Sequence, residues 1–153
     1  MTTRLFQWLA LLFMASAIIP AGAHLAALPN KIGLVQEDYF VVQQIYAGWS
    51  LFGISTIGAI VTSLAFAVAL MRDGRPYGYA LAAFLLAAAN LVIFFIWTLP
   101  ANQATRNWTV APANWEALRA QWEYSHAVNA IVILAAFACL LVAVSRRLSD
   151  RGP

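Results

Sequence analysis

Four long apolar stretches, separated by shorter polar segments, dominate the chain. They place helices at about residues 5–28, 45–71, 77–99 and 115–148. Each is at least as long as the roughly 20 residues that a helix needs to cross the hydrocarbon core of a membrane. Because a spanning segment must satisfy its own backbone hydrogen bonds in lipid, we expect helices and no strands. The pattern predicts an all-α fold, an integral membrane up-down four-helix bundle, with residues 1–153 as a single domain.

The composition strengthens this prediction. Of the 153 residues 63% are hydrophobic and 10% charged, with a mean hydropathy of +0.75. A soluble domain is about half apolar and a quarter charged, so lipid is the natural surroundings of this chain. The net charge of +3 rests on only nine basic residues. Topology accounts for them better than a nucleic-acid partner, and we expect none.

The basic residues divide unevenly between the two sides of the expected bundle. Six arginines fall on the side of the chain ends and three basic residues on the other: Arg4, Arg72, Arg75, Arg146, Arg147 and Arg151 against Lys31, Arg106 and Arg119. The positive-inside rule then predicts cytoplasmic termini, and we expect a bacterial inner membrane. Residues 21–23 (AGA) resemble a signal-cleavage site, but the apolar run is longer than a usual signal core, so we expect it to be retained.

Small residues recur every four positions along the second apolar stretch. They are Ser55, Ala59, Ser63 and Ala67. Such a row lets another helix approach closely in lipid. We expect it to pack within the bundle; the alternative is a face that pairs with a second copy of the chain in a homo-oligomer. The single Cys139 lies in an apolar run and is expected to serve packing.

The fourth helix is too long for the membrane alone. Asn114 is suited to cap it and Glu116 lies in its first turn, so about 50 Å of helix follow at 1.5 Å per residue. One stripe of this helix carries Trp115, Arg119, Trp122, His126, Asn129 and Ile133, and Glu123 flanks it. One interpretation is an interfacial tryptophan belt with Arg119 and Glu123 as an ordinary ion pair.

The other polar residues within the apolar stretches lie at a similar depth. They are His24, Gln43, Gln44, Tyr46, Asn90 and Trp97. Polar groups at this depth should face the bundle interior and find partners. Together with the stripe they predict a polar pocket in the outer half of the bundle. The alternative is that each polar residue pairs separately and fixes the register of the helices.

Two histidines are candidate ligands for one metal ion or one haem iron. His24 and His126 lie on different helices at matching depth, and we expect them to approach one another. Glu123 is either a third ligand or an acid–base group. The sequence requires no cofactor. It has no Gly-rich phosphate loop, Ser-His-Asp constellation or cysteine pair, so phosphoryl transfer, serine hydrolysis and thiol–disulfide exchange have no support in the sequence.

Several motifs resemble one known family. The first part comprises residues 24–31 (HLAALPNK) and 39–46 (YFVVQQIY). The second comprises residues 97–103 (WTLPANQ), 107–108 (NW), 114–119 (NWEALR) and 122–127 (WEYSHA). They resemble the anthrone-oxygenase-like family of small four-helix membrane proteins, most of which have no assigned function. Characterised members are similar to cofactor-independent oxygenases that act on polycyclic anthrones. The resemblance implies functional positions at His24, Asn102, Arg119 and His126.

We therefore expect a membrane oxidoreductase or oxygenase that acts on a lipophilic aromatic small molecule. His126, oriented by Glu123, would remove a proton, and Arg119 and Asn102 would stabilise the oxyanion that develops. The candidate catalytic residues are His126, Glu123, Arg119, His24 and Asn102. One alternative is a structural or accessory subunit of a larger membrane complex. Others are a carrier of a lipid or small molecule and a haem- or metal-binding membrane protein.

Overall fold

The computed structural model describes residues 2–149, and all regular elements in that part of the chain are helical. In chain order they are α1 (Thr2–Lys31), α2 (Gln36–Gln43), η1 (Gln44–Tyr46), η2 (Trp49–Phe52), α3 (Gly53–Arg72), α4 (Gly78–Ile93), η3 (Phe94–Thr98), α5 (Leu99–Ala104) and α6 (Trp115–Ser149). Here η1 and η2 are 3₁₀ turns, whereas η3 is a π-helical turn.

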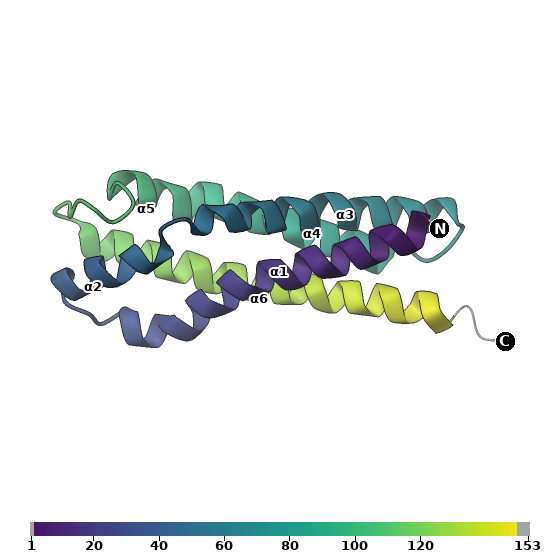
Figure 1. The fold of residues 1–153 in the computed structure, drawn as a ribbon, viewed down its shortest axis with the longest axis horizontal. Coiled ribbons are helices and arrows are strands. Elements are labelled where there is room, and N and C mark those ends of the chain that lie inside the picture. The colour runs from purple at the N-terminus through teal and green to yellow at the C-terminus, as the bar shows by residue number, and fades with distance from the viewer. Residues whose placement is uncertain (1, 150–153) are drawn as a thin grey trace.

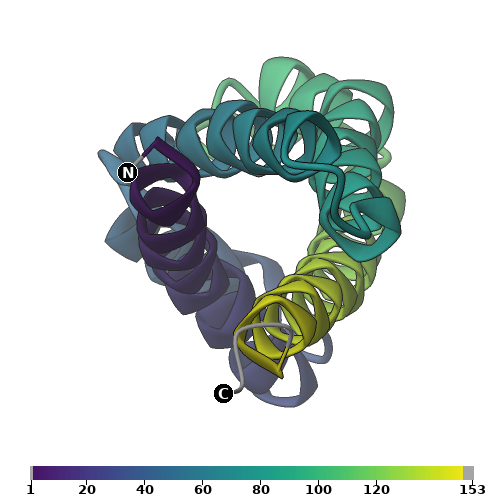
Figure 2. The same ribbon diagram turned by 90° about the vertical axis from the view of Figure 1, so that its right-hand side faces the viewer.

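The long helices lie side by side along the molecule (Figure 1). Helix α1 packs on α3 and α6, and α4 packs on the same two helices, so the four enclose a common interior (Figure 2). The start of α1 and the end of α6 lie at one end of the molecule, and α2 and α5 lie at the other. We call these the terminal end and the loop end.

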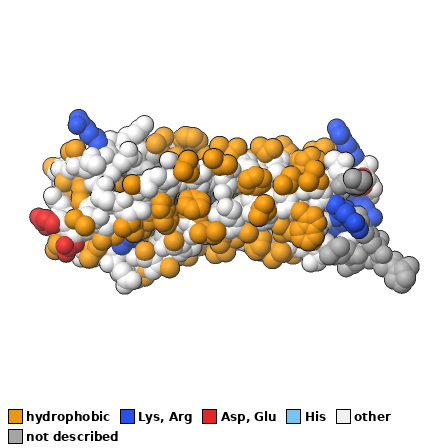
Figure 3. Space-filling view, viewed as in Figure 1, with side chains coloured by type: hydrophobic (Ala, Val, Ile, Leu, Met, Phe, Trp, Pro, Cys, Tyr) orange, Lys and Arg blue, Asp and Glu red, His pale blue; other side chains and the backbone are white. Residues whose placement is uncertain are grey.

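Four helices are long and apolar enough to cross a membrane. They are Thr2–Lys31, Trp49–Arg72, Gly78–Ala104 and Trp115–Arg147, with mean hydropathies between 1.9 and 2.8. Figure 3 shows a wide band of apolar side chains between an end rich in Lys and Arg and an end that carries acidic groups. This distribution fits an integral membrane protein. Arg151 and Asp150 lie outside the described residues.

We call the parts of the bundle nearer to these two ends the terminal half and the loop half. Small residues pack the helices of the terminal half together. Ala59, Ser63 and Ala67 are buried, as the four-residue spacing predicts, and Ser55 shares a hydrogen bond of 2.8 Å with Ser16. Gly58 faces the Phe13 ring so closely that a β-carbon there would lie 2.4 Å from the ring. The row therefore packs α3 against α1 within the chain.

Three helix boundaries differ from the approximate predicted ones. The first helix continues through Pro29 to Lys31, and the third continues past Pro100 to Ala104. Proline lacks a backbone N–H, and the π turn just before Pro100 adjusts the local hydrogen bonding, so the chain stays helical. The second predicted helix does not begin at residue 45, because Gly48 adopts φ +83° and separates two 3₁₀ turns from each other. The fourth helix is confirmed.

Candidate functional site: a cavity lined by two histidines

A cavity of about 620 Å³ lies in the half of the bundle nearer the loop end. Its deeper wall is mainly apolar, with Asn90 and Asn129 as polar exceptions; the apolar residues there are Ala17, Pro20, Ala21, Leu91, Phe94 and Ile133. Nearer the loop end the wall becomes polar and aromatic. Cavities of this size hold drug-sized molecules, and a mainly apolar wall with a few polar groups is typical of such sites. The polar pocket predicted from the sequence is therefore present as a space within the fold.

The two histidines stack on each other at the cavity wall. The ring centroids of His24 and His126 are 4.0 Å apart and the rings are 23° from parallel. Three further rings surround them: Tyr46 at 4.3 Å and Trp49 at 5.4 Å from His24, and Trp122 at 5.0 Å from His24 and 4.2 Å from His126. Their predicted approach is confirmed. Within the described chain His24 Nδ1 is buried without a hydrogen-bond partner.

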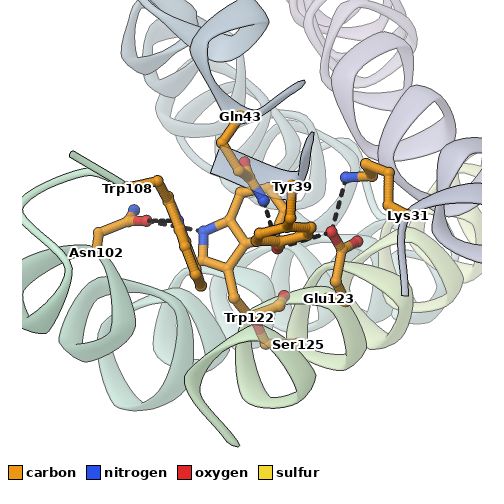
Figure 4. A network of polar contacts seen from close by, with 8 residues as sticks. All are labelled: Lys31, Tyr39, Gln43, Asn102, Trp108, Trp122, Glu123 and Ser125. Atoms are coloured by element: carbon orange, nitrogen blue, oxygen red, sulfur yellow. Dashed lines mark hydrogen bonds and ion pairs between the residues drawn. The ribbon is translucent and has the colours of Figure 1, made fainter. Parts of the chain in front are cut away.

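Asn102 presents an oriented amide to the same space. Its Oδ1 accepts hydrogen bonds from the indole nitrogens of Trp108 (3.2 Å) and Trp122 (2.8 Å), as Figure 4 shows. Because two donors hold the oxygen, the amide N–H groups are left to donate to a ligand in the cavity, which Asn102 lines. The sequence-predicted Asn102 is thus at the site.

A second polar position lies deeper in the cavity wall, where α4 meets α6. The Asn90 amide donates to the backbone oxygen of Asn129 at 2.9 Å. This bond leaves the Asn129 Oδ1 buried and without a partner within the described residues. Both side chains line the cavity. A buried acceptor of this kind is costly unless something donates to it, so it marks a place for a ligand hydroxyl or a water.

A buried charge network lies beside the cavity (Figure 4). Lys31 Nζ is 2.9 Å from Glu123 Oε1, and their side chains are 4% and 0% exposed. The Tyr39 hydroxyl donates to the same oxygen at 2.9 Å, and the Gln43 amide donates to the Tyr39 hydroxyl. Burial, followed by the neighbouring Glu123 charge, raises the pKa of Tyr39. Tyr39 therefore keeps its proton and remains a donor.

This network supports the aromatic wall. Lys31 Nζ lies 4.7 Å from the centre of the Tyr46 ring and 4.9 Å from that of Trp122. Both rings contact His24. A desolvated cation over an aromatic face is held by the ring quadrupole. The ion pair thus fixes the rings that position the histidines, although Lys31 and Glu123 do not themselves line the cavity.

Two predicted roles need correction because the predicted partners are elsewhere. Glu123 pairs with Lys31 and Tyr39, so it neither orients His126 nor forms the expected ion pair with Arg119. Arg119 lies outside the cavity wall, donates to the Leu34 backbone oxygen at 2.6 Å and lies 4.7 Å from the Trp115 ring. The lower part of the predicted stripe, from Trp122 to Ile133, does line the cavity.

The prediction that Trp97 contributes to the pocket is also wrong. It is 49% exposed and does not line the cavity, whereas Asn90 does. The seven-residue spacing returns to the same face only in a regular α-helix. The π turn at Phe94–Thr98 intervenes and turns Trp97 outward.

The stacked histidines do not fit a single metal ion or haem iron held by both. A metal needs each ring to direct an in-plane nitrogen lone pair at it, at about 2.0–2.1 Å for zinc. In nearly parallel stacked rings the lone pairs run side by side and do not converge. Within the described residues, no three His, Cys, Asp or Glu side chains gather as a metal site.

Sequence reasoning missed four residues that shape this region: Lys31, Tyr39, Trp49 and Trp108. Lys31 is the only lysine of the chain and directly follows the first apolar stretch, a position that suggested exposure. Tyr39 follows two acidic residues, which suit the first turn of a helix. That signal predicts α2, but not the ion pair that α2 covers.

No family model, curated protein or solved structure matches this chain. The resemblance to the anthrone-oxygenase-like family therefore stays a prediction that rests on the sequence motifs.

Proposed function

We propose that the cavity binds a lipophilic aromatic molecule and that the histidine pair removes a proton from it, so that molecular oxygen can react with the carbanion. The observation that carries this proposal is the His24–His126 stack at the wall of an aromatic cavity. Neither imidazole makes a hydrogen bond to another described residue, and both line a space that can hold a planar ring system. This arrangement suits a general base better than a structural contact.

The reaction is an oxidation of an acidic CH₂ group that is conjugated with a carbonyl through an aromatic ring system, as in anthrone. A histidine takes one proton, and the carbanion delocalises onto the carbonyl oxygen, to which the Asn102 amide donates. The carbanion passes one electron to O₂, and the radical pair combines to form a C–O bond. The hydroperoxide anion takes the proton back from the imidazolium and then loses water. The balance is CH₂ plus O₂ to C=O plus H₂O, with no further reductant.

The remaining parts of the cavity suit this chemistry. Three tryptophans and Tyr46 provide flat faces for an aromatic ligand, and the deeper wall is apolar. Removing water from such a space strengthens the donor contact to the developing oxyanion. We further propose that the four helices form an up-down bundle across a bacterial inner membrane with cytoplasmic termini. The arginines at the terminal end support that orientation.

Oxygen uptake tests the proposal. Purified protein in detergent is given anthrone, and O₂ consumption and anthraquinone formation are followed with ¹⁸O₂ as the label. We expect one labelled oxygen in the new carbonyl. His24→Asn and His126→Asn should each lower the rate by about 10²–10⁴-fold, as loss of a general base does. Gln103→Ala, an exposed change in α5 outside the cavity, is the matched control.

Two results would overturn this function. One is an unchanged rate in both histidine variants at unchanged melting temperature. The other is no uptake above the spontaneous rate, together with purification only alongside other chains, which would favour the accessory-subunit alternative.

A further inference from the structure

The formal charge on the cavity wall comes from a single residue. Among the described residues that line it, Arg106 is the only one with a formal charge at neutral pH. The acidic residues of the loop end, Glu37, Asp38 and Glu116, are exposed and do not line the cavity. Glu123 is paired with Lys31. The deeper part of the cavity wall is therefore uncharged, and the part formed by Arg106 carries its single positive charge.

A strained turn sets the position of Arg106. Arg106, Asn107 and Trp108 have φ angles of 47°, 54° and 61°, three successive non-glycine residues in the left-handed region. Such a run persists only where the surrounding structure holds it. Here the Asn107 N–H donates to the Asn102 backbone oxygen at 2.7 Å, and the Trp108 N–H donates to Thr105 Oγ1 at 3.1 Å.

The buried side chain of Trp108 holds this turn in place. It is 3% exposed and its indole nitrogen donates to Asn102, the residue that also faces the cavity. The turn is thus fixed to Asn102 twice, by the backbone N–H of Asn107 and by the side chain of Trp108. Arg106 itself is exposed, and within the described chain its guanidinium makes no hydrogen bond or ion pair. Because Arg106 is exposed and also lines the cavity, we take this part of the wall as its mouth, where the cation is available to a ligand.

We propose that the mouth of the cavity recognises an acidic group, a carboxylate or a phosphate, through Arg106, so that the ligand is an anionic amphiphile whose aromatic body lies against the histidine pair. This inference rests on the proposed function and adds the charge of the substrate to it. A guanidinium matches a carboxylate or phosphate with paired hydrogen bonds. The apolar depth of the cavity accepts only the uncharged part of the molecule.

A matched pair of probes tests the inference: anthracene-2-carboxylate and its neutral isostere anthracene-2-carboxamide. Binding to the purified full chain in neutral detergent is measured by equilibrium dialysis and by quenching of tryptophan fluorescence. We expect the carboxylate to bind at least tenfold more tightly than the carboxamide. Arg106→Gln should reduce that ratio to below twofold and leave the carboxamide affinity unchanged. Arg72→Gln, an exposed arginine at the terminal end, is the matched control and should keep the ratio.

A second arm separates two sources of the acid. If phosphatidylglycerol in nanodiscs displaces the carboxylate from the wild type but not from Arg106→Gln, the group is a lipid phosphate; if it does not compete, the acid belongs to a small molecule. Equal affinity for both probes, an unchanged ratio in Arg106→Gln or no binding of either probe would overturn the inference. Equal affinity with intact anthrone oxidation would overturn only the inference, whereas a preserved ratio without oxidation would overturn only the proposed function.

Discussion

The two halves of the bundle use the same four helices in different ways. In the terminal half, nine of the fourteen buried core residues are alanine, and helices approach closely enough that Gly58 touches the Phe13 ring. In the loop half, the buried cluster consists of Tyr39, Trp108, Trp122, Ala101 and Leu118, with a charged pair beside it. Small residues let helices close onto one another, whereas large rings that meet edge to face hold them apart.

This difference explains where the cavity lies. In the terminal half the buried core is mostly alanine, and the close approach of α1 and α3 at Gly58 brings the backbones together. In the loop half the backbone departs from regular helix at Gly48, at the π turn and at Arg106–Trp108. Of these, only the π turn lies within a candidate membrane span, and irregular backbone there is tolerated where it lines a cavity or is buried in protein. The terminal half thus acts as a rigid support on which the loop half builds a site.

The largest expected effect comes from breaking the buried ion pair. Lys31→Met leaves Glu123 charged and unpaired in the protein interior, which should cost about 3–5 kcal/mol of unfolding free energy. The double variant Lys31→Met/Glu123→Leu removes both charges and should recover most of that loss, although Tyr39 then lacks its acceptor. Unfolding in mixed detergent micelles, followed by tryptophan fluorescence, measures both.

A double variant no more stable than Lys31→Met would contradict this interpretation. The loop half would then depend on the packing of these side chains and not on their charges.

Tyr39→Phe tests the same network more gently. It removes a donor to a buried carboxylate, and hydrogen bonds to charged groups are worth about 1.5–3 kcal/mol. The wild type should also lose stability above the ordinary tyrosine pKa of 10.0, because the unfolded chain releases this proton while the folded state, with the raised pKa, retains it. The slope should be about 1.4 kcal/mol per pH unit.

The comparison is made between the two proteins along one alkaline series. Tyr39→Phe should lack this component of the slope, and identical slopes in the two proteins would show that Tyr39 ionises freely in the folded state.

The sequence predicts the helices and their close packing better than it predicts the candidate site. Helix number, the small-residue row and the approach of the two histidines all follow from apolar runs and spacing, since these depend on position along regular helices. The partners of Glu123 do not follow. Arg119 is one helical turn away in sequence, yet the carboxylate pairs with Lys31, which is brought near only by the tertiary packing of α1 against α6. The predicted position of Trp97 is wrong for a local reason: the sequence does not predict the π turn that precedes Pro100.

In the terminal half, Gly58→Val should cost about 1–3 kcal/mol, as overpacking of a tight core does. A β-carbon at this position meets the ring atoms of Phe13 at 2.4–2.7 Å, so the ring or one of the two helices has to shift. Gly22→Ala in α1 is the control, because a β-carbon there meets nothing within 4 Å. The control should be neutral or stabilising by up to about 1 kcal/mol.

Melting temperatures of the two glycine variants in one detergent provide the measurement. Equal melting temperatures would show that α1 and α3 separate easily, and the terminal half would then not be the rigid support described above.

The smallest effect is expected at Asn107, in the strained turn at the cavity mouth. Asparagine tolerates the left-handed region better than most residues, so most of the strain is already relieved. Asn107→Gly should stabilise the fold by less than about 1 kcal/mol, whereas Asn107→Ala, which lacks both the short amide and glycine's freedom, should destabilise it by a similar amount. The informative result is that the two substitutions change the stability in opposite directions. If glycine destabilises and alanine does not, the Asn107 side chain holds the turn by a contact, and its φ angle is not what matters. If both changes are neutral in stability but glycine weakens binding of anthracene-2-carboxylate, the stiffness of the turn serves ligand binding, since a looser backbone no longer holds Arg106 at the mouth. Melting temperature and carboxylate affinity measured on the same two variants separate these outcomes.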